Sequence, residues 1–472
     1  MSEGKVQDNV QGKGPPGGAL QKRAKGAATN PQGDPVVLGL NGVEVPVRHK
    51  GGVGYRTYEV HQRERVGQST EKIKPIQLIS EDFLRDPYPL LGILRENYPC
   101  YRDWLSNQYW VTRFDDVTSL IQDEANFETR PKLWFYGRED YGRDLFNELP
   151  VLEAHASRVD ANAEALAERV IGDLAGRGHA NLATEFAARY ALELLIAVLD
   201  LPDEDAGEFA ERYWRMQRGY LWDPVAEQAG LRAMDELATY FYPLMTERRK
   251  SPGDDLISAV AALDLPDGPA TPQDLVVTLL ERDHETLHGS LANYWYLLLT
   301  HPDQLHRVQE ERRLVKLGYL ETLRHSTPVL TARRFTRQEV ERFGLLLPEG
   351  ALVMCSAAAA NRDPRIFSDP DTFVVDRKDI CHREARGQFR ADGLATGVAP
   401  GFGKPSIHPA LPEDRPRSLF AINRDTAVTV SRVLLDMLAD LKLATGAAPC
   451  LRSRRLGEMH TCWDLPVTFR KR

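Results

Sequence analysis

Apolar residues recur along this chain mostly at the spacing of helices. Between residues 161 and 174, and again between 186 and 201, apolar positions repeat with the period of an amphipathic helix. Residues 275–299 predict a long apolar helix, and residues 427–441 predict another. Residues 352–358 have the pattern of a short strand. We therefore expect many helices and few strands in this part of the chain.

The N-terminal residues differ in composition from the rest. Residues 1–34 are rich in Gly, Gln, Lys and Pro and carry too little apolar surface to fold, which predicts a disordered tail. Residues 36–45 predict a β-hairpin, because Asn41-Gly42 between β-branched runs favours a type I′ turn. Pro46 places one of the two strands at a sheet edge.

Charge and cysteine usage exclude several classes of protein. The 472 residues carry a net charge of -8 without a dense Lys/Arg block, which disfavours nucleic acid and anionic membranes as partners. The five cysteines are scattered and form no Cys-x-x-Cys pair, so neither a disulfide framework nor a cysteine zinc site is indicated. No apolar run is long enough to span a bilayer, and the N-terminus lacks the apolar core of a signal peptide. A cytoplasmic protein is expected.

Three motifs in the second half of the chain belong together. Glu321-Thr322-Leu323-Arg324 comes first, residues 360–364 read Ala-Asn-Arg-Asp-Pro, and residues 369–373 read Asp-Pro-Asp-Thr-Phe, followed by Arg377. Together they resemble the cytochrome P450 superfamily, the haem-thiolate monooxygenases. In that family the glutamate and the two arginines form a buried structural triad. Residues 321 and 324 lie on one helix face, so their side chains can pair.

The resemblance also implies the fold. It predicts a mainly α fold with small β-sheets, in a single large cytochrome P450-like domain over residues 79–472. Residues 35–78, which contain the predicted hairpin, are then an added N-terminal segment.

The haem-binding loop of the family is altered. Residues 398–408 read VAPGFGKPSIH, and Ile407 stands where the family has its ligand cysteine. A thiolate donates electron density to the iron, and isoleucine has no lone pair to donate. The arginine that follows the ligand in the family is matched by Arg424, about ten residues too late, after a proline-containing insert at 408–417.

The contacts to the haem propionates are reduced as well. In the family one helix supplies a His-x-x-x-Arg pair, whereas here His155 and Arg158 have the wrong spacing and about twenty residues are missing nearby. Arg334 still matches a propionate arginine, and His408, beside the lost ligand, is a remnant that can bind iron as histidine does elsewhere. We expect no cofactor and, in particular, no haem.

The helix on the oxygen side of the family's pocket is changed too. The sequence Arg282-Asp283-His284-Glu285-Thr286 keeps the acid–threonine pair but replaces two small residues with Arg282 and Asp283. A buried arginine needs a counter-charge, either an acid nearby or an anionic ligand. Arg282, Asp283, Glu285 and Thr286 are therefore the candidate pocket groups.

Two further patterns have alternative interpretations. His284 and His288 complete a His-Glu-x-x-His zinc motif, but motif matches include false positives, and packed histidines are the preferred interpretation. Trp214, Tyr220 and Trp222 either line a pocket or pack between helices.

Three functions stay open. Haem-less members of the superfamily are auxiliary proteins of bacterial secondary metabolism that bind and activate glycosyltransferases, and this chain is similar to them in its lost cysteine. The second hypothesis is a cofactor-independent enzyme that cyclises, dehydrates or isomerises a small natural-product intermediate in the remodelled pocket. The third is a haem monooxygenase with a ligand other than cysteine.

Overall fold

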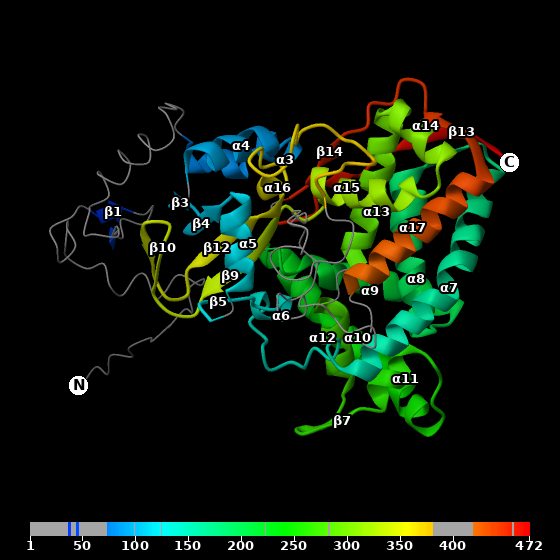
Figure 1. Cartoon of the computed structure of the whole chain (residues 1–472). Helices are drawn as coiled ribbons and strands as arrows, with labels where there is room; N and C mark the ends of the chain where they lie inside the picture. The colour runs from blue at the N-terminus through cyan, green and yellow to red at the C-terminus, as the bar shows by residue number, and fades with distance from the viewer. Residues whose placement is uncertain are drawn as a thin grey trace, which may run out of the picture.

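Long helices occupy one side of the molecule, and the largest sheet lies on the other (Figure 1). The computed structural model describes residues 73–98, 100–123, 125–221, 223–281, 284–380, 419–455 and 457–472, with only the backbone at Gln122, His284 and Glu285, and also two strands at 36–38 and 44–46. In chain order the helices are η1 (Pro75–Ile79), α3 (Glu81–Arg85), α4 (Tyr88–Asn97), α5 (Phe114–Gln122), α6 (Lys132–Phe135), α7 (Leu149–Ala175), η2 (Leu182–Ala188), α8 (Arg189–Leu199), η3 (Asp203–Asp205), α9 (Ala206–Arg218), α10 (Pro224–Lys250), α11 (Leu256–Ala261), α12 (Pro272–Glu281), α13 (His284–Thr300), α14 (Pro302–Glu310), α15 (Leu314–His325), α16 (Ala357–Ala360) and α17 (Leu419–Met437).

The strands form one five-stranded sheet and several small ones. The large sheet has the order β3 (Tyr101–Asp103), β4 (Gln108–Val111), β12 (Leu352–Ser356), β9 (Thr331–Thr336), β5 (Phe127–Glu128). A three-stranded sheet has the order β13 (Leu438–Leu443), β16 (Pro466–Lys471), β6 (His179–Asn181). The two-stranded sheets pair β1 (Val36–Leu38) with β2 (Glu44–Pro46), β7 (Asp264–Leu265) with β8 (Gly268–Pro269), β10 (Val340–Arg342) with β11 (Leu345–Leu347), and β14 (Leu451–Arg452) with β15 (Thr461–Cys462).

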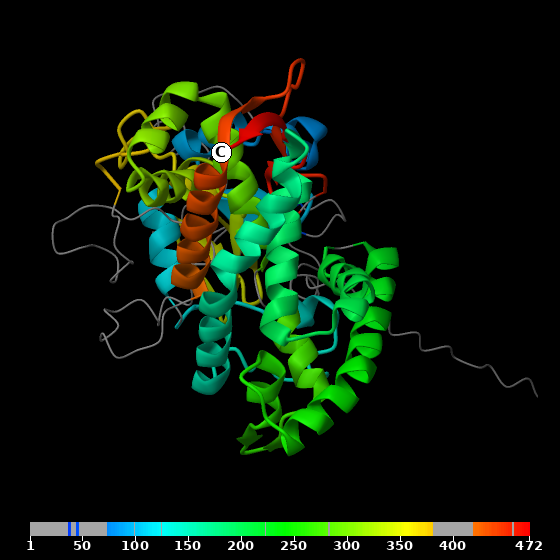
Figure 2. The same ribbon diagram turned by 90° about the vertical axis from the view of Figure 1, so that its right-hand side faces the viewer.

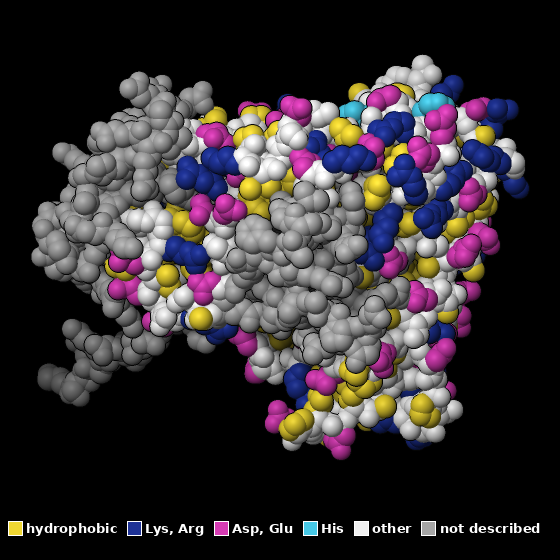
Figure 3. Space-filling model, in the orientation of Figure 1, with side chains coloured by type: hydrophobic (Ala, Val, Ile, Leu, Met, Phe, Trp, Pro, Cys, Tyr) yellow, Lys and Arg dark blue, Asp and Glu magenta, His cyan; other side chains and the backbone are white. Residues whose placement is uncertain are grey.

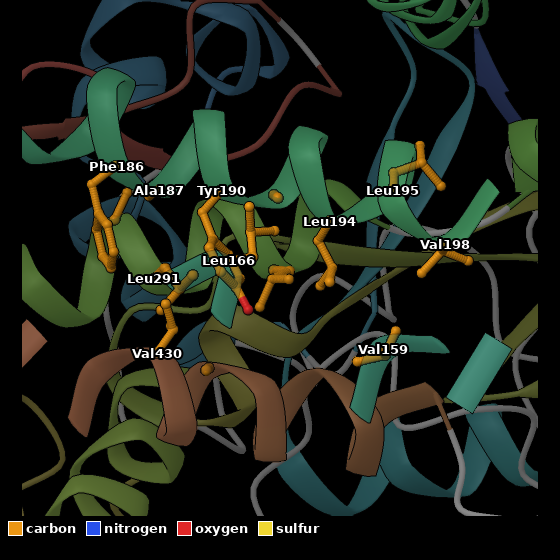
Figure 4. Packing of buried hydrophobic residues seen from close by; sticks show 14 of the residues in the cluster. Val159, Leu166, Phe186, Ala187, Tyr190, Leu194, Leu195, Val198, Leu291 and Val430 are labelled. Carbon is orange, nitrogen blue, oxygen red and sulfur yellow. The ribbon is translucent and has the colours of Figure 1, made fainter. Parts of the chain in front are cut away.

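The main core lies where α7, α8, α13 and α17 pack against one another. Figure 4 shows Leu166 of α7, Tyr190 of α8, Leu291 of α13 and Val430 of α17 turned toward a common interior. The hydroxyl of Tyr190 donates to the carbonyl of Ala163 at 2.9 Å, so this buried polar group is satisfied. Apolar burial of this extent is the main term that favours folding.

A second core lies under the large sheet. Strand β12 runs parallel to β4 and antiparallel to β9, with Val353 opposite both Tyr109 and Arg334. Val353 and Cys355 pack with Phe114 of α5, so this helix covers one face of the sheet. Strand β9 is thereby fixed between two neighbours, which positions its two arginines.

Helices α9 and α10 form a pair at the right-hand edge of Figure 2. Phe209 of α9 and Phe241 of α10 meet edge to face, with ring centroids 6.3 Å apart. The first turn of α10 is capped by Asp223, whose carboxylate accepts from Val225 N at 3.0 Å. The pair carries Gln217 and brings it against α12, which also packs on α10.

Most of the predicted elements are found, with several boundaries shifted; α7, for example, begins at Leu149 and not near residue 161. The strand predicted over 352–358 ends at Ser356, because the Ser356 hydroxyl accepts from Ala359 N at 3.2 Å and starts α16. The helix predicted to reach residue 441 ends at Met437, because the next residues pair with β16 as strand β13. Residues 275–299 are covered by α12 and α13, and residues 282 and 283 lie outside the described part.

On the face seen in Figure 3, Lys and Arg side chains gather over α14, α15 and α17, interspersed with acidic ones. Several of these form ion pairs, such as Arg307 with Asp376 at 2.9 Å and Arg312 with Asp436 at 3.0 Å. None of the helices within the described ranges is both long and apolar enough to cross a membrane.

Candidate functional site

The predicted pocket residues are only partly described. Thr286 is buried near the start of α13, with 8% of its surface exposed. Arg282 and Asp283 lie outside the described residues, as does the side chain of Glu285. The site is therefore built from the groups around the last turn of α12, which leads into this segment.

A side chain from α9 binds that last turn. Gln217 is fully buried, and its amide nitrogen donates to the carbonyls of Leu279 at 3.0 Å and Leu280 at 3.2 Å. The last four carbonyls of a helix have no donor within the helix, and buried carbonyls need partners. Gln217 supplies the hydrogen-bond donor for two of these carbonyls. Its amide oxygen accepts from Lys132 Nζ at 3.0 Å, which connects α6 to the same network.

Glu281, the last residue of α12, also binds α6. Its carboxylate accepts from Leu133 N at 2.9 Å. Burial raises the pKa of this carboxyl, while the hydrogen bond and the charge of Lys132 act in the opposite direction. Glu281 therefore holds its proton more tightly than an exposed glutamate does. A sequence pattern gives no signal for it, since its partner is a backbone amide on a distant helix.

Aromatic rings continue the site from α6 toward β9. Trp134 and Phe335 have ring centroids 5.2 Å apart. The guanidinium of Arg130 lies 4.4 Å from the Trp134 ring and 4.3 Å from the Phe335 ring. Its charge is balanced by Glu128, at 3.0 Å. Cations over aromatic faces are stabilised by the ring quadrupole.

A second group of rings lies beside the first. Phe135 and Tyr220 have ring centroids 6.5 Å apart. Lys132 Nζ lies 5.0 Å from the Tyr220 ring, and the guanidinium of Arg333 lies 5.0 Å from the Phe135 ring. Burial lowers the pKa of Arg333. We call Lys132, Phe135, Gln217, Tyr220, Glu281 and Arg333 the α6 cluster.

Arg334, the predicted propionate arginine, is the neighbour of Arg333 on β9. Successive side chains of a strand point to opposite faces, so the side chains of Arg333 and Arg334 lie on opposite faces of β9. Nη1 of Arg334 donates to the carbonyl of Arg333 at 2.9 Å.

The structure brings together the three residues of the predicted triad. Glu321 accepts from Arg324 Nε at 2.7 Å and from Arg377 Nε at 3.0 Å. Arg324 also donates to the carbonyls of Asn361, at 2.9 Å, and Pro370, at 2.7 Å. The three motifs seen in the sequence therefore meet at one buried carboxylate.

The structure also describes His155 and Arg158, the predicted remnants of the propionate pair. Both residues lie on α7, where His155 is fully buried and its ring packs edge-on against Phe146 at 5.3 Å. Arg158 binds Asp200 and Asp254, each at 3.1 Å. Residues 136–148, between α6 and α7, contain no helix.

His288 of the zinc motif lies in an apolar surrounding. It is 4% exposed, and its ring centroid is 5.8 Å from that of Trp463 and 6.5 Å from that of Trp214. Burial, and then the charge of Arg454, lowers its pKa to about 4. The side chain of His284 lies outside the described residues. Within the described ranges no three His, Cys, Asp or Glu side chains gather as metal ligands.

The remaining predicted positions are Ile407, His408, Trp222 and Arg424. Ile407 and His408 lie outside the described residues, as does Trp222. Arg424 is buried on α17 and binds the adjacent Asp425 at 2.9 Å.

Comparison with known proteins identifies the fold. A family model described as "Cytochrome P450" matches residues 232–378. The solved structure of cytochrome P450 CYP109Q5 from Chondromyces apiculatus is 21% identical, with a TM-score of 0.66 over 83% of this chain and 97% of that one. An unusual cytochrome P450-like monooxygenase involved in microbial secondary metabolism is 19% identical, with a TM-score of 0.64 over 81% of this chain and 98% of that one.

Sequence relatives extend the match. The vitamin D(3) 25-hydroxylase of Pseudonocardia autotrophica is 30% identical over 405 residues, which are 78% of this chain and 96% of that protein. The 6-deoxyerythronolide B hydroxylase of Saccharopolyspora erythraea is 31% identical over 339 residues, 65% of this chain and 83% of that protein. The pulcherriminic acid synthase of Bacillus subtilis is 25% identical over 393 residues, 79% of this chain and 93% of that protein. The chain belongs to the cytochrome P450 family.

Proposed function

We propose that this protein works without a haem-thiolate centre, as an auxiliary partner of a biosynthetic enzyme in bacterial secondary metabolism, with a glycosyltransferase as the class of partner. One observation carries the proposal. Ile407 stands at the position of the family's thiolate ligand, and no cysteine occurs between residues 382 and 449. An isoleucine side chain offers iron no electron pair.

The described residues support the loss of the cofactor. A haem propionate needs cationic or donor groups, and the two residues that the sequence offers on α7 are engaged elsewhere. His155 packs in the core and Arg158 binds two surface carboxylates. Residues 136–148 contain no helix that could replace the missing one. These residues do not fit a haem.

The fold is kept although the cofactor contacts are not, which favours a binding role. Glu321, Arg324 and Arg377 still join three motifs, so the chain keeps a well-packed core and a defined surface. A protein partner needs that surface and does not need the iron chemistry.

Reconstitution with candidate partners tests the proposal. The purified chain is added to each glycosyltransferase encoded beside it, and complex formation and sugar transfer are measured with and without it. We expect a complex and a higher transfer rate for one of these enzymes. The 6-deoxyerythronolide B hydroxylase, a relative of the same family, is the matched control and should not raise the rate. No effect on any of the transferases, or stoichiometric haem in the purified chain, overturns the proposal.

A second candidate function is a cofactor-independent acid–base enzyme, and the burial of Glu281 beside Lys132 favours it. A carboxyl whose pKa is raised keeps its proton to a higher pH and can serve as a general acid. Glu281→Gln keeps an oxygen for Leu133 N and removes the titratable proton. In a producing strain the enzyme role predicts accumulation of an unconverted intermediate in this variant, whereas the partner role predicts an unchanged product. A haem band in the spectrum would instead support a monooxygenase with another ligand.

A further inference from the structure

Arg333 of β9 carries a charge that no acidic residue in the described part of the chain balances. It is half-buried, and its guanidinium makes no hydrogen bond or ion pair with any residue that the structure describes. Its contacts are the ring of Phe135, at 5.0 Å, and the electrostatic field of the Tyr220 hydroxyl. A desolvated charge is costly unless it is paired.

The acidic groups of this region already have partners. Glu128 accepts from Arg130 at 3.0 Å and from Arg337 at 3.2 Å. Glu281 accepts from Leu133 N and lies in the field of Lys132. Lys132 itself donates to a neutral acceptor, the amide oxygen of Gln217. One cation therefore lies near each ring, Lys132 at Tyr220 and Arg333 at Phe135, and Arg333 has no counter-ion among the described residues.

A glycine packs closely against the guanidinium. Gly457, in the segment between β14 and β15, has a φ of +78°, a conformation that favours glycine. A Cβ at this position would lie 2.8 Å from Nη2 of Arg333 and 3.4 Å from a methyl carbon of Leu221. Any larger residue would press on the guanidinium, so only glycine fits where this backbone packs against Arg333.

We propose that Arg333 binds the carboxylate of a small organic acid whose apolar part packs on Phe135 and Tyr220. The planar fork of a guanidinium matches a carboxylate with two parallel hydrogen bonds. One unpaired arginine matches a single negative charge, whereas a phosphate dianion favours several donors. The aromatic pair lies next to the charge. This site is independent of the partner role proposed above, because it requires only the free chain.

Binding of matched acids and amides to the full chain tests the proposal. The probes are benzoate, 3-phenylpropionate and octanoate, each beside its carboxamide, together with inorganic phosphate, and affinity is measured by calorimetry. We expect at least one acid to bind about tenfold more tightly than its amide, as loss of a charge-assisted hydrogen bond predicts. Arg333→Gln should remove that preference. Arg130→Gln, which alters a paired arginine of the neighbouring ring group, should keep it.

Stability of the free protein gives a second measurement. Arg333→Met keeps apolar contact with Phe135 and removes the unbalanced charge, so the variant should melt at or above the wild-type temperature and should no longer be stabilised by the acids. Equal affinity for acids and amides, tighter binding of phosphate than of every acid, or no binding by any probe overturns the proposal. A variant that melts well below wild type would assign Arg333 a structural role instead.

Discussion

The guanidinium of Arg324 meets the carboxylate of Glu321 with two hydrogen bonds, Nε to Oε2 at 2.7 Å and Nη2 to Oε1 at 2.8 Å. The two side chains are 0% and 1% exposed. They are one helical turn apart on α15, so the pair is local in the sequence. Arg377, from a distant part of the chain, binds the same carboxylate. It therefore adds a long-range contact to this local pair.

Removing the carboxylate should destabilise the fold strongly. Glu321→Ala leaves Arg324 and Arg377 buried without their counter-charge, and such a loss typically costs about 3–5 kcal/mol. Urea unfolding followed by circular dichroism measures it. The matched control is Glu310→Ala, which removes an exposed ion pair with His306 and should cost less than about 1 kcal/mol. Similar unfolding midpoints for the two variants would show that the triad contributes no more than a surface pair.

The purified protein should lack a Soret band and any thiolate signature with carbon monoxide. We expect this because Ile407 cannot ligate iron and because His155 and Arg158 are engaged on α7. Ile407→Cys supplies a thiol but none of the missing contacts, so it should not restore haem binding. An absorption spectrum after expression with a haem precursor checks both variants. Stoichiometric haem in the wild-type protein would contradict the prediction.

Acid should unfold the protein partly through two buried histidines. Burial lowers the pKa of His288 and of His460 to about 4, from 6.5 in an exposed chain. Between these values the unfolded state binds protons that the folded state does not, so stability is complete above pH 6.5 and falls as the pH drops toward 4. Each histidine contributes up to about 1.4 kcal/mol per pH unit in that window.

Unfolding free energies at several pH values isolate this contribution. In His288→Gln the difference in stability from wild type should change with pH between about 6.5 and 4 and stay constant above pH 7. A pH-independent difference would mean that His288 is protonated in the folded state or does not change its exposure.

Gly289 of α13 should not tolerate a methyl group. A Cβ there would lie 2.7 Å from Cβ of Pro328 and 2.8 Å from Sδ of Met459, which holds α13 close to the segment before β9. Gly289→Ala should cost about 1–3 kcal/mol through overpacking. Gly172→Ala is the control, because its nearest neighbour would be 3.9 Å away, and it should stabilise α7 by about 0.5–1 kcal/mol. Thermal unfolding of the two variants should shift in opposite directions.

The frame of the fold is predictable from the sequence because its signals are local or highly specific. The Glu321 and Arg324 pair lies within one helical turn, and the motifs that complete it have fixed residue types. Apolar periodicity places α8 and the part of α7 after residue 160, and it misses the first part of α7, before that residue. The end of α17 is missed because Leu438 and Leu441 remain apolar while they change from helix to strand, and only the pairing with β16 distinguishes the two.

The α6 cluster is not predictable in the same way. Gln217 binds backbone carbonyls of another helix, and carbonyls carry no residue identity. Arg333 is distinguished by having no charged partner among the described residues. This property depends on all the elements around it, so the local sequence does not predict it. Thr286 was expected in the pocket and is buried, but the charged groups predicted beside it lie outside the described residues, so its place in a pocket stays a prediction.

The contact of Gln217 with α12 links the position of α9 to the hydrogen bonding of the last turn of α12. If α9 moves away from α12, the amide leaves with it, and the carbonyls of Leu279 and Leu280 lose a donor in a region that water does not reach. Each such group costs about 1–3 kcal/mol when it is left unsatisfied. Gln217 therefore ties α9 to the end of α12, and separating the two helices at this place would cost the hydrogen bonds of both carbonyls.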